Sequence, residues 1–176
     1  MKTAYLIIIG DEILNGLTHD VNSYFLAYHL NEAGLNVTQV KVINDEEAKI
    51  LKAFREAHEE ADVIISTGGL GPTKDDITKA TLAKFYNCEV VLNETAKGYL
   101  DEYMQQRQIN RPSLNEGQAY LPEKAVPLRN EKGTAPGMRF DYNGQVAFAL
   151  PGVPAETRHF TTETIIPYLK KQLQLR

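Results

Sequence analysis

The chain has 176 residues, enough for one domain with a substantial hydrophobic core. Its formal net charge of −4 excludes a general electrostatic attraction to nucleic acid or to an anionic membrane surface. A single cysteine, Cys88, excludes an internal disulfide, and the apolar segment at residues 5–9 is too short for a secretory signal or a membrane span, so we expect a cytoplasmic protein.

The first half of the chain alternates between strand and helix patterns. Tyr5–Ile9 is an apolar run that predicts a first strand, and Val63–Ile65 is the apolar centre of a third. Between them, Asp20 or Asn22 can cap a helix for which Gly34 is a C-terminal signal. The expected elements are strands at 5–9, 37–43 and 62–67, with helices that begin near Asn22, Asp45 and Asp76. This order predicts a mostly parallel sheet with helices on both faces.

The second half adds an antiparallel hairpin to this pattern. Asn143-Gly144 is a strong turn signal between strand patterns at 138–141 and 145–150. Helical spacing predicts helices over 94–108 and 156–173, whereas the prolines and polar residues of 110–123 indicate a loop or a short helix. No repeat, low-complexity segment or flexible linker occurs, so residues 1–176 are expected to form a single domain.

A glycine-rich turn follows the third predicted strand directly. Gly68, Gly69 and Gly71 have no β-carbon, so backbone N–H groups in this turn can approach an anion closely. Asp75 and Asp76 come next, at the start of a predicted helix, where two carboxylates can recruit a divalent cation. The segment therefore predicts a phosphate cradle, although a tight turn with an acidic helix start is an equally simple interpretation.

Three groups of loops should meet at the carboxyl edge of a parallel sheet. They are residues 10–16, residues 67–76, and residues 133–137 together with 151–156. Carboxylate oxygens suit Mg²⁺ or Mn²⁺ bound together with a substrate phosphate, and Asp76 is the strongest single candidate. The acidic candidates in these loops and beside them are Asp11, Glu12, Asp20, Asp75, Asp76 and Glu156.

Four motifs occur in order along the chain. They are Gly10-Asp11-Glu12-Ile13-Leu14 followed by Asp20 and Asn22, the run from Thr67 to Thr78, Gly133-Thr134-Ala135-Pro136-Gly137, and the run from Leu150 to Glu156. Together they closely resemble the N-terminal domain of the competence/damage-inducible CinA family, within the molybdopterin-binding superfamily of molybdenum cofactor biosynthesis. The resemblance covers nearly the whole chain and implies a three-layer α/β/α fold. The chain departs from the family pattern at Glu131 and Thr157.

The resemblance also implies a role for particular residues. Asp75 and Asp76 would be catalytic, and Asp11 would join them in binding a metal ion. The residues expected to bind the substrate and its phosphate are Thr67, Gly68, Gly69, Gly71, Pro72, Thr73, Asp20, Asn22, Gly133, Thr134, Ala135, Pro136, Gly137, Pro151, Gly152 and Glu156.

For the CinA branch, the implied activity is that of an ADP-ribose pyrophosphatase, which hydrolyses a diphosphate bond with Mg²⁺, Mn²⁺ or Co²⁺. Two alternatives stay open: binding of molybdopterin or an adenylated pterin in molybdenum cofactor biosynthesis, and a non-catalytic nucleotide-binding module. The expected partner is thus a small nucleotide or pterin phosphate, with no nucleic acid or membrane, and the resemblance implies a homo-oligomer. Many relatives carry a second, amidohydrolase domain, whose activity is not expected in a chain that ends at Arg176.

Overall fold

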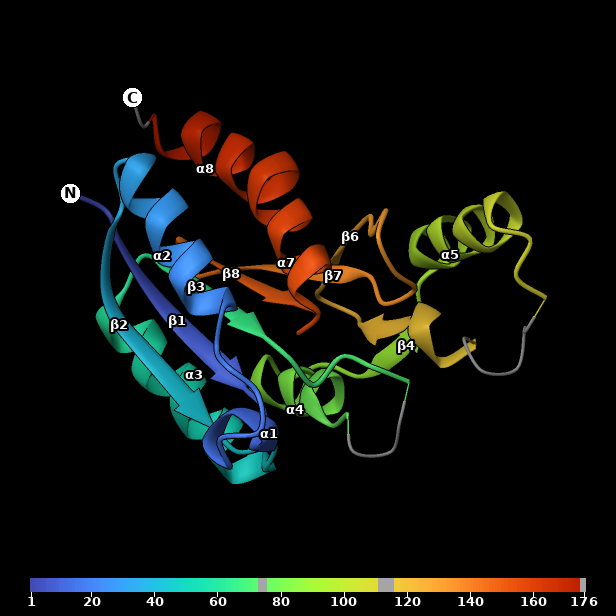
Figure 1. The fold of residues 1–176 in the computed structure, drawn as a ribbon, viewed down its shortest axis with the longest axis horizontal. Helices are drawn as coiled ribbons and strands as arrows, with labels where there is room; N and C mark the ends of the chain where they lie inside the picture. The colour runs from blue at the N-terminus through green and yellow to red at the C-terminus, as the bar shows by residue number, and fades with distance from the viewer. Residues whose placement is uncertain (73–75, 111–115, 175–176) are drawn as a thin grey trace.

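The computed structural model describes residues 1–72, 76–110 and 116–174. A six-stranded sheet with the order β2-β1-β3-β8-β7-β6 forms its centre (Figure 1). β2, β1, β3 and β8 run parallel, whereas β7 and β6 are antiparallel to their neighbours. The strand bounds are β1 Thr3–Ile9, β2 Asn36–Ile43, β3 Val63–Thr67, β6 Val126–Leu128, β7 Gly137–Tyr142 and β8 Gln145–Leu150. The mostly parallel sheet and its antiparallel hairpin are therefore confirmed.

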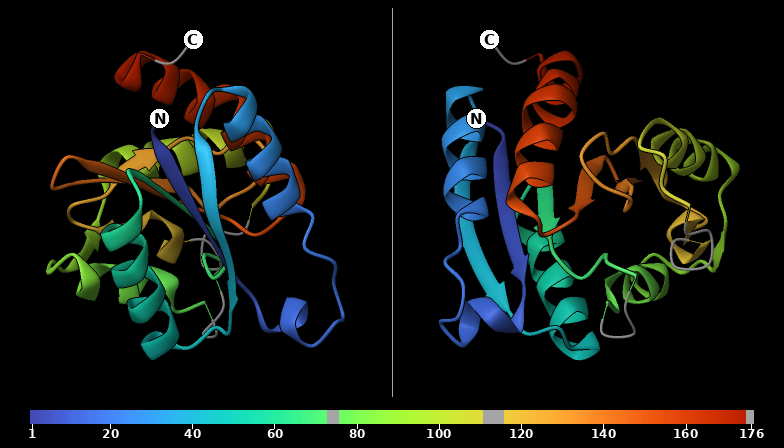
Figure 2. Two further views of the ribbon diagram at one scale, coloured as in Figure 1. Left: turned by 90° about the vertical axis from the view of Figure 1, so that its left-hand side faces the viewer. Right: turned by 45° about the vertical axis from the view of Figure 1, so that its right-hand side comes forward.

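Helices cover both faces of this sheet, which gives three layers (Figures 1 and 2). α2 and α8 lie on one face, and α3 and α4 lie on the other. The helices are α1 Asp11–Leu14, α2 Asn22–Glu32, α3 Glu47–Glu60, α4 Thr78–Phe85, α5 Glu94–Gln106, the 3₁₀ turn η1 Glu116–Ala119, α7 Pro154–Phe160, the π-helical turn η2 Thr161–Ile165, and α8 Ile166–Leu173. Within the described part of the chain, no helix has the length and apolarity that a membrane crossing requires.

β3 explains why the sheet is stable at its centre. Every residue of this strand is buried. Val63 and Ile65 pack on the face covered by α2 and α8, and Ile64 packs against the α3 face. Each fully buried aliphatic side chain contributes about 1.5–3 kcal/mol to folding, so a strand buried on both faces fixes the position of the glycine turn that follows it.

The predicted signals at the ends of α2 act as expected. The Asp20 side chain accepts a hydrogen bond from the backbone N–H of Ser23 at 3.0 Å. Gly34 follows the helix with φ +90°, in the left-handed region that favours glycine. Asn93 provides a further cap, since its side chain accepts a hydrogen bond from the N–H of Ala96 at the start of α5.

Three short strands were not predicted. β4 (Val90–Leu92) and β5 (Tyr120–Pro122) pair as a separate antiparallel sheet, so the interpretation of 110–123 as only a loop or short helix was incomplete. Three residues are too few to show an alternating pattern. β6 contains Pro127 and is the edge strand of the main sheet, where the missing N–H group of a proline is tolerated.

The predicted closing helix over 156–173 is interrupted. A π-helical turn, η2, separates α7 from α8. Pro167 lies in the first turn of α8 and has no N–H group with which to continue the helical hydrogen bonds. The hydroxyl groups of Thr161 and Thr162 also donate to backbone carbonyls four residues earlier, which competes with regular helical geometry.

Candidate functional site

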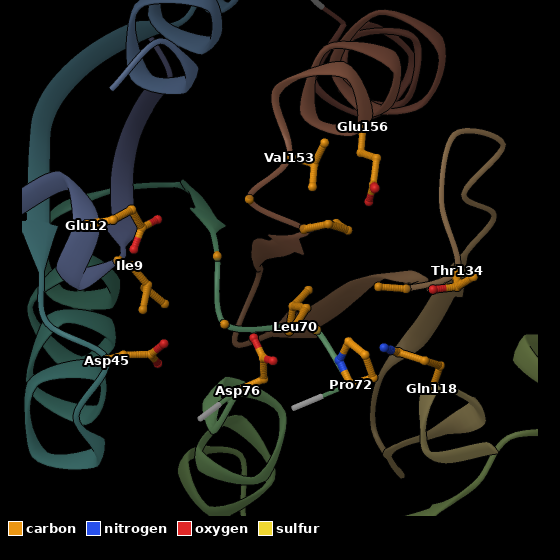
Figure 3. A pocket seen from close by; sticks show the side chains of 17 residues that line it. Ile9, Glu12, Asp45, Leu70, Pro72, Asp76, Gln118, Thr134, Val153 and Glu156 are labelled. Atoms are coloured by element: carbon orange, nitrogen blue, oxygen red, sulfur yellow. The ribbon is translucent and has the colours of Figure 1, made fainter. Parts of the chain in front are cut away.

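A pocket of about 440 Å³ lies at the carboxyl ends of β1, β3 and β8 (Figure 3). This is the edge at which open α/β sheets bind ligands. The lining residues come from the loops after these strands, from the end of β2, from η1, and from the loop between β6 and β7. They are Ile9, Gly10, Glu12, Asp45, Gly68, Gly69, Leu70, Gly71, Pro72, Asp76, Gln118, Thr134, Ala135, Pro151, Gly152, Val153 and Glu156.

The glycine turn after β3 forms the floor of this pocket. Gly68 and Gly69 have φ values of +104° and +69°, which residues other than glycine rarely adopt. A β-carbon at Gly68 would overlap the carbonyl oxygen of Ile9, and one at Gly69 would overlap the hydroxyl of Thr78. The backbone of this turn is therefore packed too closely against its neighbours to carry side chains, and the floor of the pocket is largely main chain.

Asp76 lies beside the turn, just before α4. A β-carbon on Gly71 would stand 2.6 Å from Oδ2 of Asp76, so the carboxylate packs directly against the glycine. Lys79, one turn further along, donates from Nζ to the carbonyl oxygen of Gly117 at 2.8 Å. Burial lowers the pKa of Lys79 to about 8, against the opposing effect of the Asp76 charge. Lys79 therefore stays mostly protonated at neutral pH and supplies a positive charge next to Asp76.

Two further carboxylates line the pocket on the side of β1 and β2. Glu12 folds back over Gly10, where an added β-carbon would stand 2.6 Å from Oε1 of Glu12. Asp45 follows the end of β2 and faces the same space (Figure 3). Asp11 does not line the pocket, because its carboxylate accepts hydrogen bonds from Nδ2 of Asn44 at 2.9 Å and from the N–H of Asp45 at 3.4 Å.

Glu156 enters the pocket from the first turn of α7. Asn130, which is 6% exposed, donates from Nδ2 to Oε2 of Glu156 at 2.9 Å and to the carbonyl oxygen of Ala135 at 2.7 Å. Burial raises the pKa of Glu156, and the hydrogen bond from Asn130 opposes this shift only in part. The network fixes the loop that carries Thr134 and Ala135 to the helix that carries Glu156.

The loop after β8 is held by two side chains behind the pocket. Asn22 donates from Nδ2 to the carbonyl oxygen of Gly152 at 2.8 Å. Thr157, one of the departures from the family pattern, is fully buried and donates its hydroxyl to the carbonyl oxygen of Pro151 at 2.9 Å. Gly152 packs closely against the glycine turn, since a β-carbon there would stand 3.2 Å from Cα of Gly68.

The structure brings ten of the predicted site residues together in the pocket. They are Gly68, Gly69, Gly71, Pro72, Asp76, Thr134, Ala135, Pro151, Gly152 and Glu156. Thr73 and Asp75 lie outside the described residues.

The remaining predicted site residues that the structure describes do not line the pocket, and they lie in other surroundings. Thr67 is buried in β3 and paired with Leu150, Asp20 caps α2, and Asn22 holds Gly152. Gly137 lies in β7 and packs against the ring of Phe160. Gly133 and Pro136 line a much smaller cavity beside α5. Asp11, Asp20, Asn22, Thr67, Gly133, Pro136 and Gly137 thus do not line the pocket directly, and their predicted roles in binding stay predictions.

Several lining residues were absent from the predicted site. Glu12 was among the acidic candidates, and Asp45 follows a predicted strand at the same sheet edge, so both had a signal in the sequence. Ile9, Gly10, Leu70 and Val153 are neighbours of predicted residues. Gln118 had no signal, because its place in the wall depends on how η1 packs against the rest of the chain.

The predicted metal site stays a prediction, because one of its three ligands, Asp75, lies outside the described residues. Among residues 1–72, 76–110 and 116–174, no group of three His, Cys, Asp or Glu side chains could hold a metal ion. Asp11 is turned toward Asn44, and Glu12, Asp45, Asp76 and Glu156 enter the pocket from separate elements (Figure 3).

Comparison with known proteins gives consistent results. Residues 5–171 match the model of the Probable molybdopterin binding domain. A competence-damage inducible protein of Caldicellulosiruptor bescii is 38% identical over 96% of this chain and 41% of its own length. A CinA-like protein of Cytophaga hutchinsonii is 39% identical, over 97% of this chain and 41% of its own length. The chain thus spans about two fifths of these relatives.

Solved structures show the same relation. The crystal structure of the protein CinA of unknown function from Thermoplasma acidophilum superposes with a TM-score of 0.83 at 33% identity, covering 97% of this chain and 96% of that one. The molybdopterin biosynthesis enzyme MoaB from Thermus thermophilus superposes with a TM-score of 0.64 over 99% of this chain and 95% of that one. At 17% identity, the second likeness shows a shared fold alone.

Proposed function

This chain belongs to the family of the Probable molybdopterin binding domain, with CinA-like proteins among its relatives, and on that premise we propose that its pocket binds a phosphorylated pterin of the molybdopterin type. The observation that carries this proposal is the main-chain floor formed by residues 68–71 at the end of β3. Backbone N–H groups in such a turn are suited to phosphate oxygens, and the pocket volume suits a small ligand.

The charges of the pocket favour a ligand with hydrogen-bond donors as well as phosphate. Glu12, Asp45, Asp76 and Glu156 line it, and the charge of Lys79 interacts with that of Asp76. A purely anionic ligand would meet four carboxylates and gain little from them. A pterin also carries ring and amino N–H groups, and carboxylates accept hydrogen bonds from such groups. Phosphate at the glycine floor and the ring between the walls is the arrangement that uses both features.

Gly71→Ala tests this proposal. The new methyl group must displace the Asp76 carboxylate and narrow the floor, and forcing a methyl group into a packed site costs about 1–3 kcal/mol. Isothermal titration with neopterin phosphate should show binding to the wild type and binding about tenfold weaker to Gly71→Ala. Gly98→Ala is the matched control, because a β-carbon at Gly98 meets nothing within 4 Å. Equal affinity of all three proteins, or no binding to the wild type, would contradict the proposal.

Hydrolysis of ADP-ribose is a second candidate. Its support is the position of Asp76 beside the glycine turn, together with the CinA-like relatives. If the activity exists, the protein with Mg²⁺, Mn²⁺ or Co²⁺ should release AMP from ADP-ribose, and Asp76→Asn should abolish the release while its melting temperature shows that it stays folded. Absence of AMP release with all three metals would rule this candidate out.

A further inference from the structure

We propose that Gln118 recognises the ring edge of the ligand, and that this edge presents a hydrogen-bond donor next to an acceptor. This role rests on the proposed function and deepens it, because it names the part of the ligand that one wall of the pocket binds. Gln118 belongs to η1 and lines the pocket on the side opposite Glu12 and Asp45 (Figure 3).

The carboxamide of Gln118 is buried and has no hydrogen-bond partner in the part of the chain that the structure describes. The residue is 1% exposed, and neither Nε2 nor Oε1 has a partner among the described residues. At least nine in ten buried polar groups in proteins are hydrogen-bonded, and each exception costs about 1–3 kcal/mol. A donor and an acceptor left together on a pocket wall are therefore suited to a ligand that satisfies both.

The backbone around Gln118 is fixed from two sides. Lys79 of α4 donates to the carbonyl oxygen of Gly117 at 2.8 Å, and the N–H of Asn93 donates to the carbonyl oxygen of Ala119 at 2.9 Å. In Figure 3 the side chain extends from η1 toward Pro72. Because its neighbours on both sides are bonded to other elements, the backbone of Gln118 is held in place before a ligand arrives, which lowers the entropy cost of binding.

The chemistry of a carboxamide limits what it can recognise. It offers N–H donors and a carbonyl acceptor side by side, so its complement is an edge with one group of each kind. A phosphate offers acceptors only, and a single hydroxyl group reaches one of the two atoms. The lactam edge of a pterin and the amino edge of an adenine both fit this description. The shared ligand chemistry is thus a heteroaromatic ring that carries a donor next to an acceptor.

Gln145, in contrast, is a glutamine whose two amide atoms both have hydrogen-bond partners within the protein. Its Nε2 donates to the carbonyl oxygens of His58 and Ala61 at 2.7 and 2.6 Å, and its Oε1 lies 3.0 Å from Nδ1 of His58. It is at the start of β8, at the other end of the strand from the pocket. Gln145 is therefore a matched control for a substitution at Gln118.

The test compares Gln118→Met with Gln145→Met in the whole chain. Methionine keeps the length of the side chain and removes both hydrogen-bonding atoms. Without ligand, Gln118→Met should melt at the same temperature as the wild type or higher, because two unpaired groups are removed. Gln145→Met should melt at a lower temperature, because it loses three contacts. A clear loss of stability in Gln118→Met would overturn the claim that its carboxamide is unpaired.

Binding is then measured with neopterin phosphate, AMP and inorganic pyrophosphate as probes. Gln118→Met should bind the ring-bearing compound about tenfold more weakly than the wild type does, with pyrophosphate affinity unchanged. A loss confined to neopterin phosphate identifies a pterin edge, and a loss confined to AMP identifies an adenine edge. Gln118→Glu, which keeps the shape, removes the donor and adds a negative charge, should also weaken binding.

The possible failures are distinguishable. Wild-type binding of neopterin phosphate that Gln118→Met leaves unchanged overturns the role of Gln118 and leaves the proposed function in place. Binding of AMP alone, lost in Gln118→Met, overturns the pterin proposal and supports the role of Gln118. Wild-type protein that binds neither ring compound overturns both.

Discussion

At the scale of single residues, the pocket depends on glycines whose missing side chains leave room for carboxylates. Gly71 and Gly133 leave room for the carboxylates of Asp76 and Glu156, respectively. The glycine positions could be predicted because they stand together in the sequence directly after a buried strand. The partner of Gly133 could not be predicted, because Glu156 lies 23 residues further along the chain and meets Gly133 only in the folded protein.

Glu156 gives a prediction about pH at this scale. Burial raises its pKa above the ordinary value of 4.5, so the folded state holds the proton more tightly than the unfolded chain does. The stability that protonated Glu156 contributes is fully present below pH 4.5 and is lost as the pH rises through the raised pKa. Urea unfolding should therefore show that the stability of Glu156→Gln relative to the wild type increases from about pH 4 to pH 7. A difference that stays constant or shrinks over this range would contradict the shift.

At the scale of helices and strands, elements with a repeating pattern were predictable and short ones were not. β3 and α3 are long enough to show apolar runs or helical spacing, and their bounds agree with the prediction within a few residues. β4 and β5 are three residues each and exist because they pair with each other. The position of Gln118 follows from that pairing, since η1 leads directly into β5, and no local signal could reveal it.

His58 links three elements, and its environment also predicts a pH effect. From α3, its Nδ1 lies 3.0 Å from Oε1 of Gln145 in β8, and its Nε2 lies 3.0 Å from the hydroxyl of Tyr86. Its ring also stacks on Phe85 of α4. Burial lowers the pKa of His58 below 6.5, and its bond with Gln145 offsets this only partly.

The sign of the effect follows from this lowered pKa. As the pH falls, His58 takes up a proton in the unfolded chain before it does so in the folded protein. The free energy of unfolding therefore decreases as the pH falls below 6.5. The melting temperature of the wild type should therefore fall more between about pH 7 and pH 5 than that of His58→Gln. His19→Gln, which changes an exposed histidine, should behave like the wild type. An equal fall in all three proteins would show that His58 does not titrate in this way.

At the scale of the whole molecule, the pocket is lined by loops of the layered sheet and, through Gln118 of η1, by the region formed by α5, η1, β4 and β5. Figure 2 shows this region beside the sheet. The parallel sheet supplies Glu12, Asp45 and the glycine floor, and the second region supplies Gln118. A parallel sheet places its loops at one edge whatever their sequence, so that half of the site was predictable. The other half depends on contacts between distant segments, which one sequence does not reveal.

A crystal structure of the protein with neopterin phosphate bound tests the central claim most directly. The phosphate should lie against the backbone of residues 68–71, and the pterin ring edge should lie within hydrogen-bond distance of both amide atoms of Gln118. Electron density for the ligand outside this pocket, or an empty pocket in crystals grown at a saturating ligand concentration, would contradict it.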